Sequence, residues 1–129
     1  MKPIFDLDMW PYAILRFEPS YTLSDDDITE YFASWTRMYE KQEKFSLLIQ
    51  AEHLDNVSST LMMKQIVYLA KTHMHAKEYL ERVGIWCPNS TVEARMNKYL
   101  NDIRAIYTPS SDIKIAYTYE DALAHVAGE

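Results

Sequence analysis

Apolar residues along this chain follow two spacings that alternate from one segment to the next. Short, mostly apolar runs bounded by turn residues predict strands at residues 3–7, 12–17, 45–50, 82–87 and 112–117. Pro3 opens the first run and favours an edge strand, because proline cannot donate a hydrogen bond to a neighbouring strand. In the run 12–17 both alternating faces carry apolar residues, which predicts a strand covered on both sides.

Between these runs, apolar residues recur every three to four positions, which predicts helices with one buried face. Residues that can cap a helix precede these segments: Ser24, Ser58 or Ser59, Ser90, and Thr118 or Asp121. The strongest start is Ser90-Thr91-Val92-Glu93, because serine followed three residues later by glutamate matches the capping box. In the second helix His73 falls on the apolar stripe, and we expect an interior histidine there.

The predicted order is two strands first, then helices and strands in alternation to the end of the chain. Such alternation favours a mostly parallel sheet with right-handed helical crossovers. We therefore predict the α/β class, with a single mixed, mostly parallel sheet of four to five strands and three to four helices. At 129 residues the chain has the length of one domain, so residues 1–129 are taken as a single domain.

Composition excludes several classes of function. Thirteen Lys and Arg against nineteen Asp and Glu give a net charge of −6, which lacks the basic footprint of a nucleic-acid binder. With one cysteine and two glycines, the chain holds neither a multi-cysteine metal site nor a glycine-rich phosphate loop. No apolar run reaches the ~18 residues of a membrane span. We expect a cytoplasmic protein without metal or cofactor, without membrane insertion, and without a nucleic-acid partner.

Two parts of the sequence carry a family resemblance. They are Leu80-Glu81-Arg82-Val83-Gly84-Ile85-Trp86, after the long helix, and Asp112–Tyr117 with the closing segment Tyr119-Glu120-Asp121-Ala122-Leu123-Ala124. With the order and lengths of the elements, they resemble the STAS domain superfamily, more closely its divergent SpoIIAA-like (STAS/SEC14-type) small proteins. The resemblance implies a STAS/SpoIIAA-like fold. It also implies a non-enzymatic binding or regulatory module that recognises a protein partner or a small ligand.

The same resemblance singles out two serines. Leu47-Leu48-Ile49, followed by a loop and Ser58-Ser59, resembles the segment that carries the regulatory serine of anti-sigma-factor antagonists. A phosphate at this predicted helix start would meet free N–H groups and the helix dipole, so Ser58 and Ser59 are candidate phosphoacceptors. The alternative is that they only cap the helix. Val57 precedes Ser58 where the antagonists have aspartate.

Loops after the parallel strands are the default place for a binding site, because ligands of open α/β sheets bind beyond the carboxyl ends of the strands. Three loops qualify, after the runs 45–50, 82–87 and 112–117. The candidate residues for contact with a ligand or partner are His53, Asp55, Ser90, Thr91, Tyr117 and Tyr119.

Two further functions stay open. In the first, a cavity between helices and sheet binds a small apolar ligand or lipid. Surplus aromatic residues would line that pocket or a homodimer interface: Trp10, Tyr12, Tyr21, Trp86 and Tyr117. In the second, an enzyme uses Cys87 or Ser58 as nucleophile and His53 as base. The alternative for Cys87 is a small buried hydrophobic residue.

Overall fold

The strands pair side by side in the order in which they occur in the chain. The computed structural model describes residues 1–129 and contains β1 (Lys2–Asp6), β2 (Tyr12–Glu18), β3 (Phe45–Gln50), β4 (Leu80–Trp86) and β5 (Asp112–Ala116). β1 is antiparallel to β2, and the other neighbours are parallel. The predicted α/β class with a mixed, mostly parallel sheet is confirmed.

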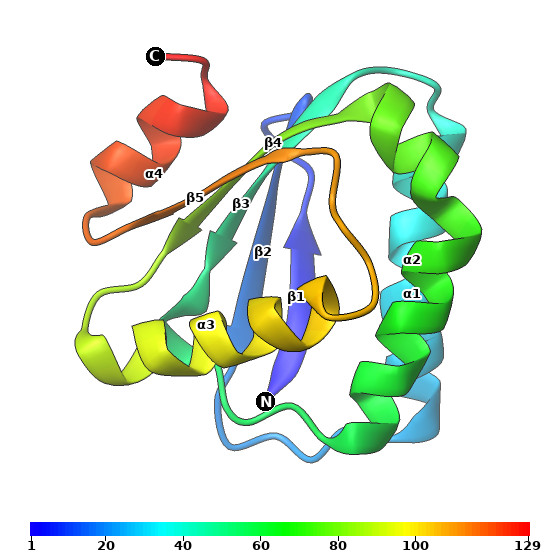
Figure 1. Cartoon of the computed structure of the whole chain (residues 1–129), viewed down its shortest axis with the longest axis vertical. Helices are drawn as coiled ribbons and strands as arrows, with labels where there is room; N and C mark the ends of the chain where they lie inside the picture. The colour runs from blue at the N-terminus through cyan, green and yellow to red at the C-terminus, as the bar shows by residue number, and fades with distance from the viewer.

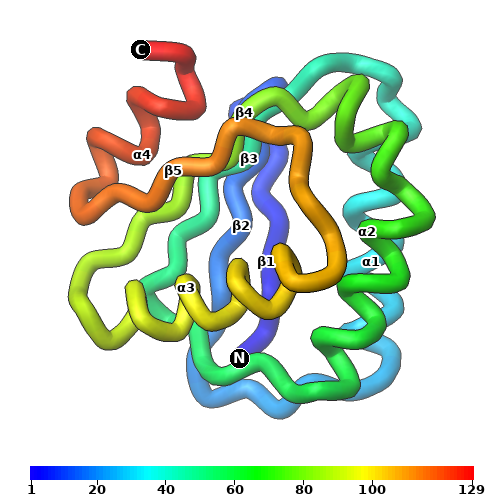
Figure 2. The backbone as a smooth tube through the Cα atoms, in the orientation of Figure 1, coloured from blue at the N-terminus to red at the C-terminus, as the bar shows by residue number.

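The helices divide unequally between the two faces of the sheet. They are α1 (Asp25–Glu40), α2 (Ser59–Tyr79), α3 (Ser90–Arg104) and α4 (Tyr119–Val126), with a short 3₁₀ helix η1 (Ala51–His53) after β3. Right-handed crossovers between strands that pair in chain order put their helices on one face, here α1, α2 and α3. α4 packs on the other face, against β3, β4 and β5 (Figures 1 and 2).

Alternation of side chains along β3 builds a separate core on each face. Leu47 belongs to the larger core, under α1–α3, whereas its neighbour Leu48 belongs to a small core with residues of α4. Gly84 of β4 lets α4 approach closely. A Cβ atom there would lie 2.6 Å from the carbonyl oxygen of Ala122. α4 therefore supplies no residue to the core that lies under α1–α3.

Local sequence explains where most helices begin. Ser24 and Asp27 form a reciprocal capping box at α1, and the Ser58 hydroxyl accepts a hydrogen bond from the Leu61 N–H at 3.2 Å. The Thr118 hydroxyl accepts from the Asp121 N–H at 3.2 Å, so threonine is the cap of α4.

Two local predictions are wrong. The cap of α3 is Asn89, whose side-chain oxygen accepts from the Val92 N–H at 3.0 Å, and Ser90 is the first helical residue. Asparagine caps as well as serine, so the earlier residue takes the position. His73 is exposed, and its ring Nδ1 contacts the Ala70 carbonyl oxygen at 3.0 Å. On an ideal helix it lies about 80° from Gln65 but only about 20° from the buried Ile66, so its angle round the helix alone does not account for its exposure.

Candidate functional site

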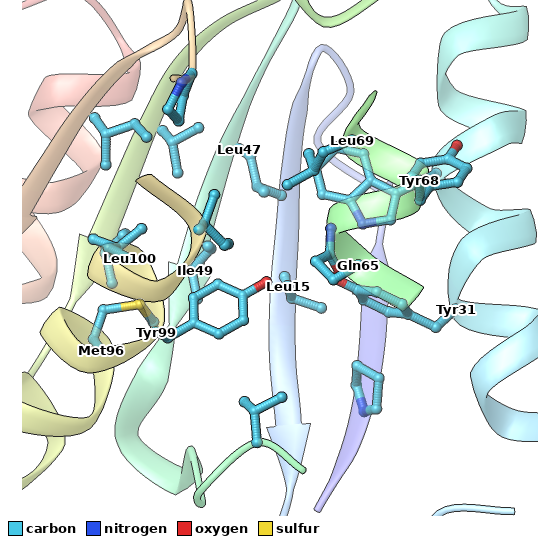
Figure 3. Close-up of a pocket in the computed structure, with 18 of the residues that line it drawn as sticks. Leu15, Tyr31, Leu47, Ile49, Gln65, Tyr68, Leu69, Met96, Tyr99 and Leu100 are labelled. Atoms are coloured by element: carbon cyan, nitrogen blue, oxygen red, sulfur yellow. The ribbon is translucent and has the colours of Figure 1, made fainter. Parts of the chain in front are cut away.

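A cavity of about 150 Å³ lies between the sheet and the helices α1, α2 and α3, and it opens partly to solvent (Figure 3). Of its 30 lining residues, 25 are hydrophobic. No lining residue has a charged side chain. The cavity is thus an apolar space with a few polar groups and no charged side chain; the Met1 α-ammonium of the wall is engaged by the Tyr21 carbonyl oxygen.

Each layer of the fold supplies part of the wall. Leu15 of β2 and Leu47 of β3 point up from the sheet, and Leu69 of α2 and Leu100 of α3 point down toward them (Figure 3). α2 packs on α1 and on β4, whereas α3 packs on η1. The Arg95 guanidinium of α3 adds a hydrogen bond of 3.0 Å to the Leu54 carbonyl oxygen. The two helices are therefore held by different neighbours, and the cavity lies beneath them.

Gln65 is the most unusual residue in the wall. Its side chain is only 6% exposed and points from α2 into the cavity (Figure 3). No side-chain hydrogen bond within the protein involves its amide, which can both donate and accept. The amide atoms are not fully buried, because the Trp35 indole nitrogen is the one fully buried side-chain polar atom without a partner, so the amide reaches the open space of the cavity. Leu61 and Leu69, one turn before and after it, are also lining residues. The amide thus interrupts an apolar ladder on the buried face of α2.

Several phenols share this space. The lining tyrosines are Tyr31, Tyr39, Tyr68, Tyr99 and Tyr107. Of their hydroxyls, that of Tyr68 is hydrogen-bonded within the protein, 2.9 Å from the Thr36 hydroxyl. Tyr31 reaches in from α1 and Tyr99 from α3 (Figure 3). The indole N–H of Trp35 is also buried and has no hydrogen-bond partner.

Burial keeps these phenols neutral. It raises the pKa of Tyr31 to about 12, against a small opposite effect of the nearby Trp35 indole. Burial also raises the pKa of Tyr99 well above its usual value, and the Tyr31 phenol adds to this rise. At neutral pH both hydroxyls therefore remain able to donate as well as accept a hydrogen bond.

The loop residues predicted as a site gather at one edge of the sheet, where β3, β4 and β5 end, but none of them lines the cavity. Ser58 caps α2, and Ser59 is its exposed first residue. Ser90 and Thr91 are exposed at the start of α3. Asp55 is exposed after η1.

The two tyrosines of the last loop differ in role. Tyr117 is 65% exposed, and the nearby Glu93 carboxylate raises the pKa of its phenol. The Tyr119 ring packs edge-on against Trp86, with centroids 5.8 Å apart. Tyr119 therefore contributes to the small core under α4, whereas Tyr117 is free to contact another molecule.

The predicted nucleophile and base are not brought into contact. Cys87 is fully buried, and burial raises the pKa of its thiol to about 11. The exposed His53 ring contacts its neighbour Glu52, Nε2 to carboxylate oxygen 3.9 Å. No hydrogen bond joins His53 to Cys87, and the Ser58 hydroxyl is engaged as a helix cap. At neutral pH Cys87 is therefore a protonated, buried thiol.

The aromatic residues singled out for a pocket are the wrong ones for this cavity. Trp10, Tyr12, Tyr21, Trp86 and Tyr117 are absent from its wall. Trp10 instead stacks on Phe45, with centroids 5.0 Å apart, and its indole N–H donates to Glu43 at 2.6 Å. Tyr31 and Tyr99, which the helical pattern assigns to ordinary core, supply the wall.

Comparisons with models of known protein families and with curated proteins find no match to this sequence. The side chains place no group of three or more His, Cys, Asp or Glu where they could hold a metal ion. None of the helices combines the length and apolar character that crossing a membrane requires. The cavity is the feature from which function is best argued.

Proposed function

We propose that this protein is a non-enzymatic binding module that holds a small, largely apolar ligand between its sheet and helices α1–α3. The cavity of about 150 Å³ carries this proposal. Protein interiors hold few voids larger than a water molecule, and an apolar cavity of roughly this size binds benzene in another protein. At about 24 cal/mol per Å³, leaving such a space unfilled costs roughly 3–4 kcal/mol of stability. A ligand that fills the cavity offsets that cost.

We include the STAS/SpoIIAA-like family in this proposal. What supports it is the order of the elements on which the resemblance rests, with an antiparallel first strand and parallel strands that pair in chain order. A small-ligand module is one of the two kinds of binding that the resemblance implies. Cys87 is a neutral, buried thiol, and the His53 ring contacts Glu52 and makes no hydrogen bond with Cys87, which favours binding over covalent catalysis.

Benzene tests the proposal directly, because it is small, apolar and uncharged. We expect saturable binding, seen as chemical-shift changes of cavity residues in NMR spectra and as a rise in Tm with benzene concentration. Leu15→Phe should abolish the binding by filling the cavity from the sheet. Ile14→Phe is the matched control, because Ile14 neighbours Leu15 but packs in the core under α4.

The outcome is clear in either direction. Binding that Leu15→Phe removes and Ile14→Phe retains would support the cavity as the site. If benzene does not bind, or if both variants bind it like the wild type, the proposal fails. Leu69→Phe, which enters the same space from α2, replaces Leu15→Phe if circular dichroism shows that the latter does not fold.

A second candidate function is recognition of a protein partner under control of phosphorylation. Ser58 and Ser59 are exposed at the start of α2, and the first turn of that helix holds no acidic residue, which favours a phosphate there. Intact-mass measurement of protein from its own cells tests it. An added phosphate mapped to Ser58 or Ser59 would support the switch. Unmodified serines, with regulation unchanged in the double alanine variant, would remove it.

A further inference from the structure

We propose that the cavity selects a compact, neutral ligand that carries one hydrogen-bonding group, of the size and kind of phenol, and that the Gln65 amide recognises that group. This inference rests on the proposed function and specifies the class of its ligand. Three independent observations lead to it: the absence of charged side chains in the wall, the unpaired amide, and the size and aromatic character of the space.

The wall excludes ions. All lining side chains are apolar or neutral, and the one charge on a lining residue, the Met1 α-ammonium, donates to the Tyr21 carbonyl oxygen, so no charged side chain of the wall is available to pair with a buried carboxylate or ammonium. An ion moved from water into such a space loses its hydration and gains no ion pair, which is among the most costly burials in proteins. A fatty-acid or amine ligand with its charged group inside the cavity is therefore disfavoured. Neutral ligands do not meet this barrier.

The Gln65 amide favours a ligand that is not purely apolar. The side chain is 6% exposed, points into the cavity, and has both a donor and an acceptor group without protein partners (Figure 3). An apolar ligand that displaced solvent from this amide would leave both groups unpaired. A hydroxyl ligand donates to the amide oxygen or accepts from the amide nitrogen. The neutral hydroxyl of Tyr99 projects from α3 on the opposite side of the space.

Size and shape favour an aromatic ring. A cavity of about 150 Å³ matches the volume at which benzene is bound elsewhere. Tyr31, Trp35 and Tyr99 contribute rings to the wall. Aromatic rings pair well edge-to-face or with an offset, which adds to the energy gained from burial alone. A single aromatic ring with one hydroxyl therefore fits the cavity volume, packs against the aromatic wall and offers a hydrogen bond to the Gln65 amide.

The test compares benzene, phenol and benzoate at pH 7, with dissociation constants from NMR titration of wild type and variants. At this pH phenol is neutral and benzoate is charged. Wild type should bind phenol about fivefold or more tightly than benzene, the value of one neutral hydrogen bond. Benzoate should bind at least about 100-fold more weakly than phenol. Gln65→Met should bring the phenol-to-benzene ratio to about one by raising the benzene affinity about fivefold, because benzene then no longer leaves an amide unpaired. The phenol affinity should stay within about twofold.

Two further variants complete the test. Tyr99→Phe removes the facing hydroxyl but keeps the ring and the amide; a phenol preference that Tyr99→Phe removes and Gln65→Met retains would assign recognition to Tyr99 and overturn the role of Gln65. Lys64→Met makes the same type of change on the exposed face of α2, beside Gln65, and it should bind like wild type. Gln65→Leu replaces Gln65→Met if the latter does not fold.

Each alternative outcome has one meaning. Binding of benzene without a preference for phenol overturns this inference and leaves the proposed function standing. A phenol preference that survives Gln65→Met overturns the role of Gln65. Benzoate that binds as tightly as phenol overturns the requirement for neutrality. Failure of both benzene and phenol to bind overturns the proposed function as well.

Discussion

Gln65→Met is expected to stabilise the ligand-free protein, although it removes the group that we assign to ligand recognition. The wild-type side chain is 6% exposed, and its amide has no partner in the protein. Burying an amide without a hydrogen bond costs about 1–3 kcal/mol. Methionine has a similar length and a similar helix propensity, so it removes this cost without a large change of shape. The Gln65 amide atoms still reach the solvent-accessible space of the cavity, because the Trp35 indole nitrogen is the one fully buried side-chain polar atom without a partner. We therefore expect Gln65→Met to gain at most about 1 kcal/mol of stability.

The assay is urea and thermal unfolding of the wild type, Gln65→Met and Lys64→Met. For a chain of 129 residues, 1 kcal/mol corresponds to about 3–6 °C in Tm. We expect a higher urea midpoint for Gln65→Met and an unchanged m-value, because the wild type and the variant expose a similar surface when they unfold. Lys64→Met, at an exposed site of the same helix, should stay within about 0.5 kcal/mol. A loss of 1 kcal/mol or more in Gln65→Met would refute the reasoning, because it would show that the amide has a stabilising partner.

Three further predictions concern stability. Gly84→Ala should cost about 1–3 kcal/mol in urea unfolding, because the new methyl group meets the Ala122 carbonyl oxygen at 2.6 Å. An unchanged midpoint would contradict this close packing. Asn89→Ala should cost about 1 kcal/mol and Ser90→Ala much less, since asparagine is the cap of α3. A larger loss of stability in Ser90→Ala than in Asn89→Ala would show instead that Ser90 is the cap. Stability should fall as pH rises above 10, because the unfolded state then releases the Tyr31 proton while the folded state, with a pKa of about 12, retains it. The slope is about 1.4 kcal/mol per pH unit for each such tyrosine, and Tyr31→Phe should reduce it in alkaline urea titrations.

The order of elements could be predicted from the sequence because it depends on local patterns. The run 45–50 is mostly apolar and matches β3 residue for residue. Where two adjacent residues can play the same part, as Asn89 and Ser90 can at α3, pattern alone does not choose between them. Helical spacing is equally ambiguous about which positions of a stripe are covered by the rest of the protein. His73 follows the spacing of the stripe but is exposed.

The sequence offered a cavity between helices and sheet only as one open alternative, and it could not predict the lining residues, because these depend on how the helices pack above the sheet. Periodicity states which face of a helix is buried, not how completely that face is packed. Tyr31 and Tyr99 therefore look like ordinary core residues in the sequence. One signal was present. Gln65 stands midway between Leu61 and Leu69 on the apolar face of α2, where a glutamine has no simple structural use.

Pairing of the strands in chain order has a consequence for synthesis on the ribosome. Each parallel strand finds its partner in the strand made just before it, so the sheet grows from β1 to β5 without waiting for later sequence. Each parallel pairing spans a helical crossover and so forms more slowly than a local contact, while domains generally fold from the N-terminus as they emerge. The cavity, however, lacks a wall until α3 has been made, around residue 104. We expect a nascent chain stalled before this helix to expose Leu15 and Leu47 to chaperones, and a chain stalled after it to bury them.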